Sequence, residues 1–201
     1  MPVESACHGT RDLPSPVHFD SYVVLQRRLT GVVKPYRTRL RVTLSLLSRT
    51  DLHLLEHQLG YDKVELADAD SWLGQGDRCF LGYIDGRAST RVWLNLRERT
   101  LPGNVKLRLG QGRVFIFNGF TLPLMRGYGL FPAVLTAALA WAEENGCEIA
   151  YADLRSRNTS SRRAFEKCGF EPLGSFRVVR VLRWERSLLP LRLRRIIADP
   201  A

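Results

Sequence analysis

The sequence predicts one α/β (α+β) domain built around a mixed sheet. The chain has 201 residues, which is long enough for one full hydrophobic core and marginal for two. Its apolar residues make up 45% of the chain and its charged residues 25%, values that are ordinary for a globular protein. The predicted strands and helices alternate irregularly, with a hairpin and one long helix between two strands. This order indicates a mixed sheet rather than a regular doubly wound fold.

Three parts of the chain differ in composition. Residues 1–20 are rich in small residues and proline and lack the basic flank and apolar core of a signal peptide, so we expect a flexible leader. Residues 21–186 carry the predicted domain. Residues 187–201 form a basic C-terminal extension in which leucine and isoleucine alternate with arginine. Such a segment lies on an anionic membrane surface, docks a partner or covers the edge of the sheet.

The first half of the domain contains strands, two helices and a hairpin. Residues 21–29 and 39–47 are predicted strands, the second half-buried because Leu40, Val42, Leu44 and Leu46 alternate with polar residues. The first helix follows with Thr50 as its N-cap and Gly60 as its stop, and a second short helix lies around 62–73. The pair Asp85-Gly86 within residues 78–96 predicts a hairpin turn with positive φ angles. A polar stretch with glycines covers 97–112.

The second half alternates strands with helices. Residues 113–122 are a predicted strand, and the alanine-rich and leucine-rich segment after it is a long helix with Pro132 in its first turn and Gly146 at its end. Residues 148–154 are the next strand. Asn158 caps a short helix that Gly169 ends, and residues 170–184 form two closing strands or one bent strand.

The bulk charge and the cysteines limit the function classes. The net charge is +10, with seven basic residues and no acid between Ser21 and Thr50, so the field attracts polyanions. The four cysteines show no C-x-x-C pair, which suggests free thiols, a cytoplasmic location and no metal cluster. No apolar run approaches the roughly 20 residues of a membrane span.

Two short motifs carry little weight. "HLLEH", residues 53–57, matches an inverted zinc-protease pattern, but its apolar neighbours leave His53, Glu56 and His57 on a solvated helix face. "GYGLFP" lacks the third small residue of a dinucleotide fingerprint, and no Gly-Lys-Ser/Thr sequence supplies a phosphate loop of the Walker type.

The segment "TLPLMRGYGLFPAVL", residues 121–135, joins a strand to the long helix. Backbone amides from Arg126 to Leu130 fall at the helix N-terminus, where the helix dipole and unpaired N–H groups favour a pyrophosphate. Gly127 and Gly129 let this backbone approach an anion, and Arg126 adds a charge-assisted contact. A tight strand-to-helix turn without a ligand is the alternative interpretation.

Taken with "NTSSRRAFEKCGF", residues 158–170, this segment resembles the GNAT superfamily of coenzyme-A-dependent N-acyltransferases. The family's phosphate turn is matched by Arg126, Gly127, Tyr128, Gly129 and Leu130. Its second motif is matched by Asn158, Ser161, Phe165, Lys167, Gly169 and Phe170. The resemblance implies a single GNAT-like domain whose mixed central sheet is splayed between the fourth and fifth core strands and flanked by helices.

The resemblance also implies acetyl-CoA as co-substrate and attack of an amine on its thioester. The pantetheine arm is expected to pair with the strand ending at Phe120, Thr121 and Leu122, with a backbone N–H of Leu122 polarising the thioester carbonyl. The implied cofactor-binding residues are these three together with Arg126, Gly127, Tyr128, Gly129, Leu130, Asn158 and Phe165. No acid lies on that strand, so Asp153 on the adjacent strand is our candidate for the general base. Asn118 and Tyr151 are weaker candidates for orienting the acceptor.

Three points depart from the family pattern or leave alternatives open. Phe131 stands where Gly or Ala is usual, and we expect it to pack under the helix. Phe165 stands where many members carry a tyrosine acid, so that role is vacant or taken by water, although the ring could still pack on the pantetheine arm. Asp153 could instead pair with one of the nearby arginines, which are Arg155, Arg157, Arg162 and Arg163.

The sequence therefore predicts an N-acetyltransferase acting on a primary amine of a small molecule such as an amino sugar. One alternative is a catalytically weak module of the same fold that binds CoA or a partner. Another is an acyltransferase whose acceptor is a protein or is associated with RNA. We expect no DNA partner and no metal; contact with an anionic surface through the basic segments and homodimer formation stay open.

Overall fold

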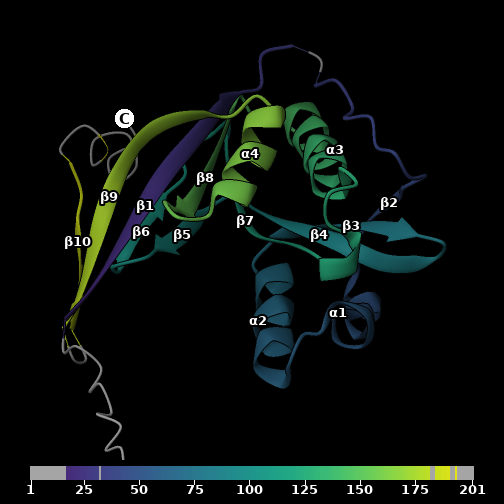
Figure 1. The fold of residues 1–201 in the computed structure, drawn as a ribbon, viewed down its shortest axis with the longest axis horizontal. Helices are drawn as coiled ribbons and strands as arrows, with labels where there is room; N and C mark the ends of the chain where they lie inside the picture. Colours follow the sequence, from purple (N-terminus) through teal and green to yellow (C-terminus); the bar gives the residue numbers. More distant parts are fainter. Residues whose placement is uncertain (1–16, 32, 182–183, 191–192, 194–201) are drawn as a thin grey trace, which may run out of the picture.

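One large sheet runs through the molecule (Figure 1). The computed structural model describes residues 17–31, 33–181, 184–190 and 193, and within these ranges eight strands form that sheet in the order β10-β9-β1-β8-β7-β4-β3-β2. A two-stranded hairpin of β5 and β6 lies beside it. The strands are β1 (Val17–Arg28), β2 (Thr43–Leu46), β3 (Arg78–Ile84), β4 (Arg87–Asn95), β5 (Glu98–Leu101), β6 (Val105–Arg108), β7 (Arg113–Thr121), β8 (Ile149–Arg155), β9 (Glu171–Val181) and β10 (Trp184–Leu188).

The centre of the sheet opens between two parallel strands. β7 and β8 pair in parallel only from Arg113 opposite Ile149 to Ile116 opposite Ala152. Beyond that point β7 stays paired with β4 as far as Thr121, and β8 stays paired with β1 as far as Arg155. The two halves of the sheet therefore diverge between the fourth and fifth core strands, and the predicted mixed, splayed sheet is confirmed.

The helices cover both faces of the sheet. They are η1 (Arg49–Asp51), α1 (Leu52–Leu59), α2 (Lys63–Gly74), η2 (Pro123–Met125), α3 (Leu130–Glu144) and α4 (Thr159–Lys167). In Figure 1, α1 and α2 lie together on one side and α3 and α4 on the other. Two apolar clusters correspond to these layers, because successive side chains of a strand point to opposite faces.

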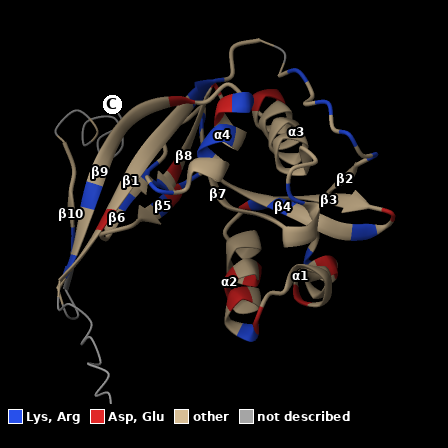
Figure 2. Cartoon of the chain, in the orientation of Figure 1, with Lys and Arg blue, Asp and Glu red and all other residues tan. Residues whose placement is uncertain are grey.

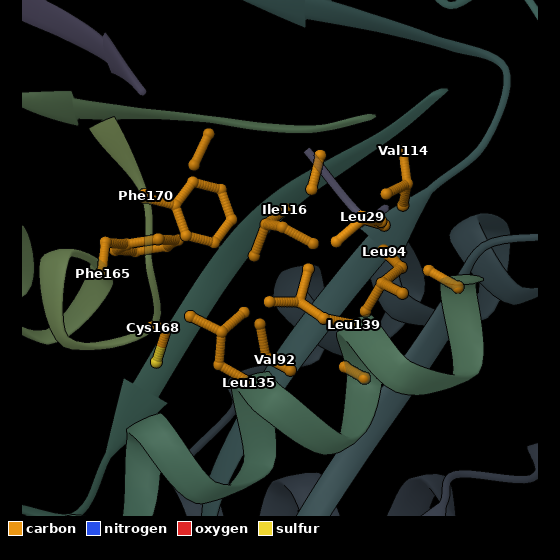
Figure 3. Packing of buried hydrophobic residues seen from close by; sticks show 14 of the residues in the cluster. Leu29, Val92, Leu94, Val114, Ile116, Leu135, Leu139, Phe165, Cys168 and Phe170 are labelled. Carbon is orange, nitrogen blue, oxygen red and sulfur yellow. The ribbon is translucent and has the colours of Figure 1, made fainter. Parts of the chain in front are cut away.

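Neighbouring residues of a strand join different clusters. On β4, Trp93 joins the cluster beneath α1, α2 and the β5–β6 hairpin, while Val92 and Leu94 join the cluster beneath α3. Figure 3 shows the α3 cluster, in which Leu135 and Leu139 of the helix face strand residues such as Val92 and Leu94, while Phe165 lies beside Phe170. This helix buries most of its length, which fixes its N-terminus beside the end of β7.

Several predicted elements are confirmed in detail. Asp85 and Gly86 form the hairpin turn between β3 and β4 with φ angles of 49° and 77°. Asn158 caps α4 by accepting a hydrogen bond on Oδ1 from the N–H of Ser161 at 3.1 Å. Gly169 follows the end of α4 with a φ of 76°. These features depend on local sequence, which explains why they could be predicted.

Two predictions for the region before β3 were wrong. The predicted strand 39–47 shrinks to β2, whose Leu44 and Leu46 side chains are each 41% exposed. β2 is the edge strand and pairs only with β3, so its alternating pattern does not bury one face. The first helix begins later than predicted, because residues around Thr50 form the 3₁₀ turn η1 and Asp51 occupies the N-cap of α1.

The ends of the domain and the stretch 97–112 also differ from the predictions. β1 begins at Val17, so the last residues of the predicted leader belong to the sheet, and residues 1–16 lie outside the described part. β10 reaches Leu188 and takes in the start of the predicted C-terminal extension, most of whose remainder lies outside the described part. Residues 97–112 contain the β5–β6 hairpin, which the sequence reading missed.

Candidate active site at the opening of the sheet

The segment between β7 and α3 forms an open turn of backbone amides. Leu122 leads into η2, which starts with Pro123, and α3 starts after Gly129. Gly127 and Gly129 have φ angles of 88° and 83°, the left-handed region where only glycine is relaxed. Gly129 occupies the N-cap of α3, and no side-chain hydrogen bond caps this end of the helix. The first amides of a 15-residue helix thus face outward with its positive dipole end.

The turn has room and charge for a pyrophosphate. A Cβ placed on Gly127 would meet nothing within 4 Å, so the backbone there borders open space. Arg126 donates from Nε to the carbonyl oxygen of Thr121 at 3.2 Å, which ties its side chain to the end of β7. Leu130 is 1% exposed and anchors the helix start in the core. The positive φ angles, the uncapped amides and the arginine fit the pyrophosphate of coenzyme A.

The end of β7 offers one backbone donor to the opening. The N–H of Leu122 donates to the carbonyl oxygen of Ser89 at 2.9 Å and is therefore used inside the sheet. In an antiparallel pair, successive residues direct their N–H groups alternately toward and away from the partner strand. The N–H of Thr121 thus points away from β4, toward the β7–β8 opening. The backbone donor predicted at Leu122 is accordingly assigned to Thr121.

A bulge distorts β7 just before this point. Asn118 has a φ of 45°, and the register between β4 and β7 shifts between Arg91 and Trp93. The Asn118 side chain accepts a hydrogen bond from Arg91 at 3.1 Å and donates one to the hydroxyl of Tyr61 at 3.1 Å. The bulge is thereby fixed to β4 and to the loop between α1 and α2.

Tyr61 is the centre of this network. Its hydroxyl oxygen accepts from Arg91 Nε at 2.7 Å and from Trp93 Nε1 at 3.1 Å, in addition to the Asn118 amide. The Arg91 guanidinium also lies over the Tyr61 ring, 4.2 Å from its centroid, and over the Phe120 ring at 4.6 Å. Burial raises the pKa of Tyr61, so the phenol stays protonated near neutral pH. Neither Tyr61 nor Arg91 was singled out from the sequence.

Asp153 lies on β8 one residue beyond the last β7–β8 pair, in a cavity of about 380 Å³. The cavity is lined by Phe117 and Asn118 of β7 and by the residues of the β5–β6 hairpin from Arg99 to Asn104. Burial raises the pKa of the Asp153 carboxyl to about 6, opposed by the positive charge of Arg99. A carboxylate with this pKa, beside a cavity at the open sheet, has the properties of a general base.

Arg99 faces the same cavity from the hairpin. Its guanidinium lies 3.6 Å from the centroid of the Phe117 ring and 5.4 Å from that of Trp72. Burial lowers the pKa of Arg99, and nearby Asp77, Asp153 and Asp68 partly restore it. Within the described residues, no ion pair joins Asp153 to any of the four arginines considered from the sequence, and Arg162 instead contacts Glu166 at 2.9 Å.

A second cavity of about 470 Å³ lies on the other side of the Tyr61 network. It reaches the end of β7 and the loop between the first two helices. Its lining consists of Glu56, His57, Gln58, Leu59, Gly60, Glu65, Arg91, Phe120 and Leu122. The carboxylates of Glu56 and Glu65 and the guanidinium of Arg91 therefore all border this cavity.

The second motif contributes mainly to the core. Phe165 is 4% exposed, and its ring centroid lies 5.4 Å from that of Phe131. It also lies 5.0 Å from the ring centroid of Phe170 (Figure 3). Phe131 packs beneath the helix as expected. Little of the Phe165 ring is accessible to a ligand in this arrangement. Asn158 uses its oxygen to cap α4, and Tyr151 is 5% exposed in the core rather than beside an acceptor site.

The histidine motif brings no third ligand. The rings of His53 and His57 are 6.5 Å apart, and in the described ranges no cluster of three or more His, Cys, Asp or Glu residues could hold a metal ion. Cys79, Cys147 and Cys168 are buried free thiols. Across the same described ranges, no helix is both long and apolar enough to cross a membrane.

The splayed sheet and the glycine turn form the arrangement that the resemblance to acyltransferases implied. A family model described as the acetyltransferase (GNAT) family matches residues 46–170, more than half of the chain. The chain belongs to this family. No curated protein matches its sequence.

Solved structures show the same fold. One is described as a GNAT-family acetyltransferase from Novosphingobium aromaticivorans, with 18% identity and a TM-score of 0.56 over 83% of this chain and 66% of that one. A GCN5-related N-acetyltransferase from Kribbella flavida has 16% identity and a TM-score of 0.55 over 81% and 58%. The aminoglycoside N-acetyltransferase AAC(6')-Iy in complex with CoA has 22% identity and a TM-score of 0.53 over 69% and 91%. The chain thus spans about two thirds or less of the first two proteins.

Proposed function

We propose that this protein transfers the acetyl group of acetyl-CoA to a primary amine of a small molecule. The observation that carries the proposal is the position of Asp153, in a cavity immediately beyond the last β7–β8 pair. The phosphate-type turn at the N-terminus of α3 adjoins the other strand of the same opening. One site would thus combine an anion-binding turn with a partly buried base.

The turn has the properties needed to hold the cofactor. Amides of residues 127–130 would bind the pyrophosphate, and Arg126 would add a charge-assisted contact. When bound, acetyl-CoA supplies an activated acetyl thioester. The N–H of Thr121, directed into the opening, would donate to the thioester carbonyl oxygen, a preorganised contact that strengthens as negative charge develops there.

Asp153 would accept the proton of the acceptor ammonium. A free carboxyl has a pKa of about 4 and is a weak base. Burial raises the pKa of Asp153 to about 6, which brings it closer to the working pH while leaving it deprotonated at pH 7. Phe165 carries no transferable proton, so we assign no protein acid to that position.

The charge of the second cavity favours a cationic acceptor. Glu56 and Glu65 border it together with a single arginine, Arg91, whereas the first cavity pairs Asp153 with Arg99. An amino sugar has several amines that such carboxylates would bind. The structural likeness to an aminoglycoside N-acetyltransferase, at 22% identity, supports the fold only. The buried free thiols are consistent with our prediction of a cytoplasmic location.

A module that binds CoA without turnover is the second candidate. It is favoured by Phe165, whose buried ring replaces a proton donor. The two candidates share the cofactor turn and differ in the role of Asp153. Thiol release from acetyl-CoA in the presence of an amine panel separates them.

The cofactor site is tested by calorimetric titration of acetyl-CoA. Gly129→Glu places a carboxylate in the turn, at a φ of 83° and against the Tyr36 ring, and we expect it to abolish binding. Gly86→Glu is the matched control, since Gly86 also has a positive φ, of 77°, but lies in the β3–β4 hairpin turn, outside the segment that leads into α3. An unchanged affinity in Gly129→Glu would refute the pyrophosphate assignment.

A further inference from the structure

The connection between β1 and β2 runs along the outside of α3. We call residues 33–41 of this connection the basic strap. The N–H of Val33 donates to Glu143 Oε2 at 3.2 Å, near the C-terminus of α3. The N–H of Tyr36 donates to Thr136 Oγ1 at 3.1 Å, about halfway along the helix. The strap therefore runs antiparallel to α3, toward the phosphate turn (Figure 1).

The strap reaches the turn itself. The N–H of Arg39 is 3.5 Å from the carbonyl oxygen of Tyr128, the residue between the two glycines. A Cβ placed on Gly129 would come within 2.9 Å of the Tyr36 ring and 3.9 Å of Thr38 Cα. Tyr36, Thr38 and Arg39 thus border the N-terminus of α3 directly. The positive charge of this region is evident from the sequence, but its place beside the turn is not.

The strap carries unneutralised positive charge. Lys34, Arg37, Arg39 and Arg41 are all exposed. None of the ion pairs found among the described residues involves any of these four cations. Figure 2 shows Lys and Arg spaced along the connection beside α3, without acidic residues among them. Keeping several exposed cations on one extended segment costs folding free energy through mutual repulsion, which a bound anion would relieve.

We propose that Arg37 and Arg39 bind the 3′-phosphate of coenzyme A. This inference rests on the proposed function, which places the cofactor's pyrophosphate on the adjoining turn. The ribose bonded to that pyrophosphate carries a second, separate phosphate at its 3′ position. A phosphomonoester is close to a dianion near neutral pH, and the planar guanidinium of arginine binds its oxygens in a bidentate manner.

Arg37 and Arg39 are the two strap cations closest in sequence to the contacts with the turn. They flank Thr38, whose Cα approaches Gly129. Lys34 lies between the contacts of Val33 and Tyr36 with the body of α3, farther from the turn. The whole strap precedes residues 46–170, so it lies outside the region that the family model matches. It is therefore a feature of this chain that the family match does not supply.

The test compares two ligands that differ only in the 3′-phosphate. Calorimetric affinities for coenzyme A and 3′-dephospho-coenzyme A are measured with the unmodified protein, with the double variant Arg37→Ala/Arg39→Ala, and with Lys34→Ala as a control for loss of strap charge. We expect the unmodified protein to bind coenzyme A about tenfold more tightly than its dephospho form, the size of one exposed charge-assisted contact. The double variant should bind both ligands with the weaker affinity, and Lys34→Ala should keep the preference.

The outcomes separate this inference from the proposed function. Equal binding of both ligands by the unmodified protein, or an unchanged preference in the double variant, overturns the role of the strap while the cofactor turn stands. If the double variant loses the same factor in affinity for both ligands, the strap acts through its general positive charge and not through contact with the 3′-phosphate. That result also overturns the role of the strap. Binding of neither ligand to the unmodified protein overturns the cofactor assignment itself.

Discussion

The ring of Phe131 lies directly over Gly119, so that a Cβ on Gly119 would come within 2.5 Å of the ring atom Cε2. Gly119 follows Asn118 in the β7 bulge, and Phe131 belongs to the first turn of α3. The bulky residue that departs from the family's turn pattern is therefore accommodated by a glycine on the strand beneath it. This pair couples the bulge on β7 to the position of the helix N-terminus.

Gly119→Ala should destabilise the protein by about 1–3 kcal/mol, because a methyl group there overpacks against the Phe131 ring. In a Phe131→Ala background the same change should have almost no effect, since the ring is gone. Urea denaturation of the unmodified protein, the two single variants and the double variant gives four free energies of unfolding. The coupling energy between Gly119 and Phe131 follows from them. Gly74→Ala is the matched control: its added Cβ meets only the end of the Arg49 side chain, at 3.3 Å. Additive effects of Gly119→Ala and Phe131→Ala would contradict the coupling.

The sequence was informative where structure is set by neighbouring residues. Gly127 and Gly129 adopt positive φ angles because the strand-to-helix turn needs them, and their spacing alone indicated this. The Asn158 cap and the turn at Asp85 depend on interactions between residues close in sequence. These are the features from which the anion-binding turn could be predicted.

The acceptor side could not be predicted in the same way. Tyr61, Arg91 and Asn118 meet across 57 residues of chain, and nothing in their local sequences indicates the contact. Arg99 reaches the cavity through the β5–β6 hairpin, which the sequence reading took for a polar stretch. Its pairing turn, Pro102-Gly103-Asn104, was the available signal, since Gly103 and Asn104 both take positive φ.

Asp153→Asn should lower kcat by about 10²–10⁴-fold, the usual contribution of a general base, with a smaller effect on the affinity for acetyl-CoA. In the unmodified protein, kcat should rise with pH through about 6, as the Asp153 carboxyl loses its proton. The pH profile of kcat for an accepted amine measures both. Asp77→Asn is the matched control: burial raises the pKa of Asp77 to about 6 as well, but its carboxylate lies outside the acceptor cavity. A normal profile in Asp153→Asn would exclude this base.

The same carboxyl should make stability fall as pH rises. The pKa of Asp153 in the folded protein, about 6, lies above its unfolded value of 3.8, so between these values the folded state binds more protons than the unfolded state. The stabilising effect of Asp153 is complete below about pH 4 and is lost as pH rises through about 6. At pH 7 the charge of Asp153 is a penalty, and Asp153→Asn should raise the free energy of unfolding by about 3 kcal/mol while activity falls. Urea denaturation at about pH 4 and pH 7 checks the sign, because at the lower pH the two proteins should differ little. A loss of stability at pH 7 would show that the charged form is favoured in the fold.

Tyr61→Phe should weaken both the fold and the catalytic step. The change removes the only acceptor oxygen that the Tyr61 ring offers to Arg91 Nε, Trp93 Nε1 and Asn118 Nδ2, so buried donors lose a partner. We expect a loss of about 2–3 kcal/mol in the free energy of unfolding.

The same network fixes the β7 bulge, so Tyr61→Phe should also affect catalysis. We expect kcat to fall more than the affinity for acetyl-CoA, because the Thr121 N–H would no longer be held in place while the α3 turn is unchanged. Tyr83→Phe is the control, since that hydroxyl accepts only an exposed hydrogen bond from Ser45 at 3.3 Å. The free energy of unfolding, the affinity for acetyl-CoA and kcat are measured on the same preparations. A loss of stability with an unchanged kcat would show that Tyr61 supports the core and does not position the site.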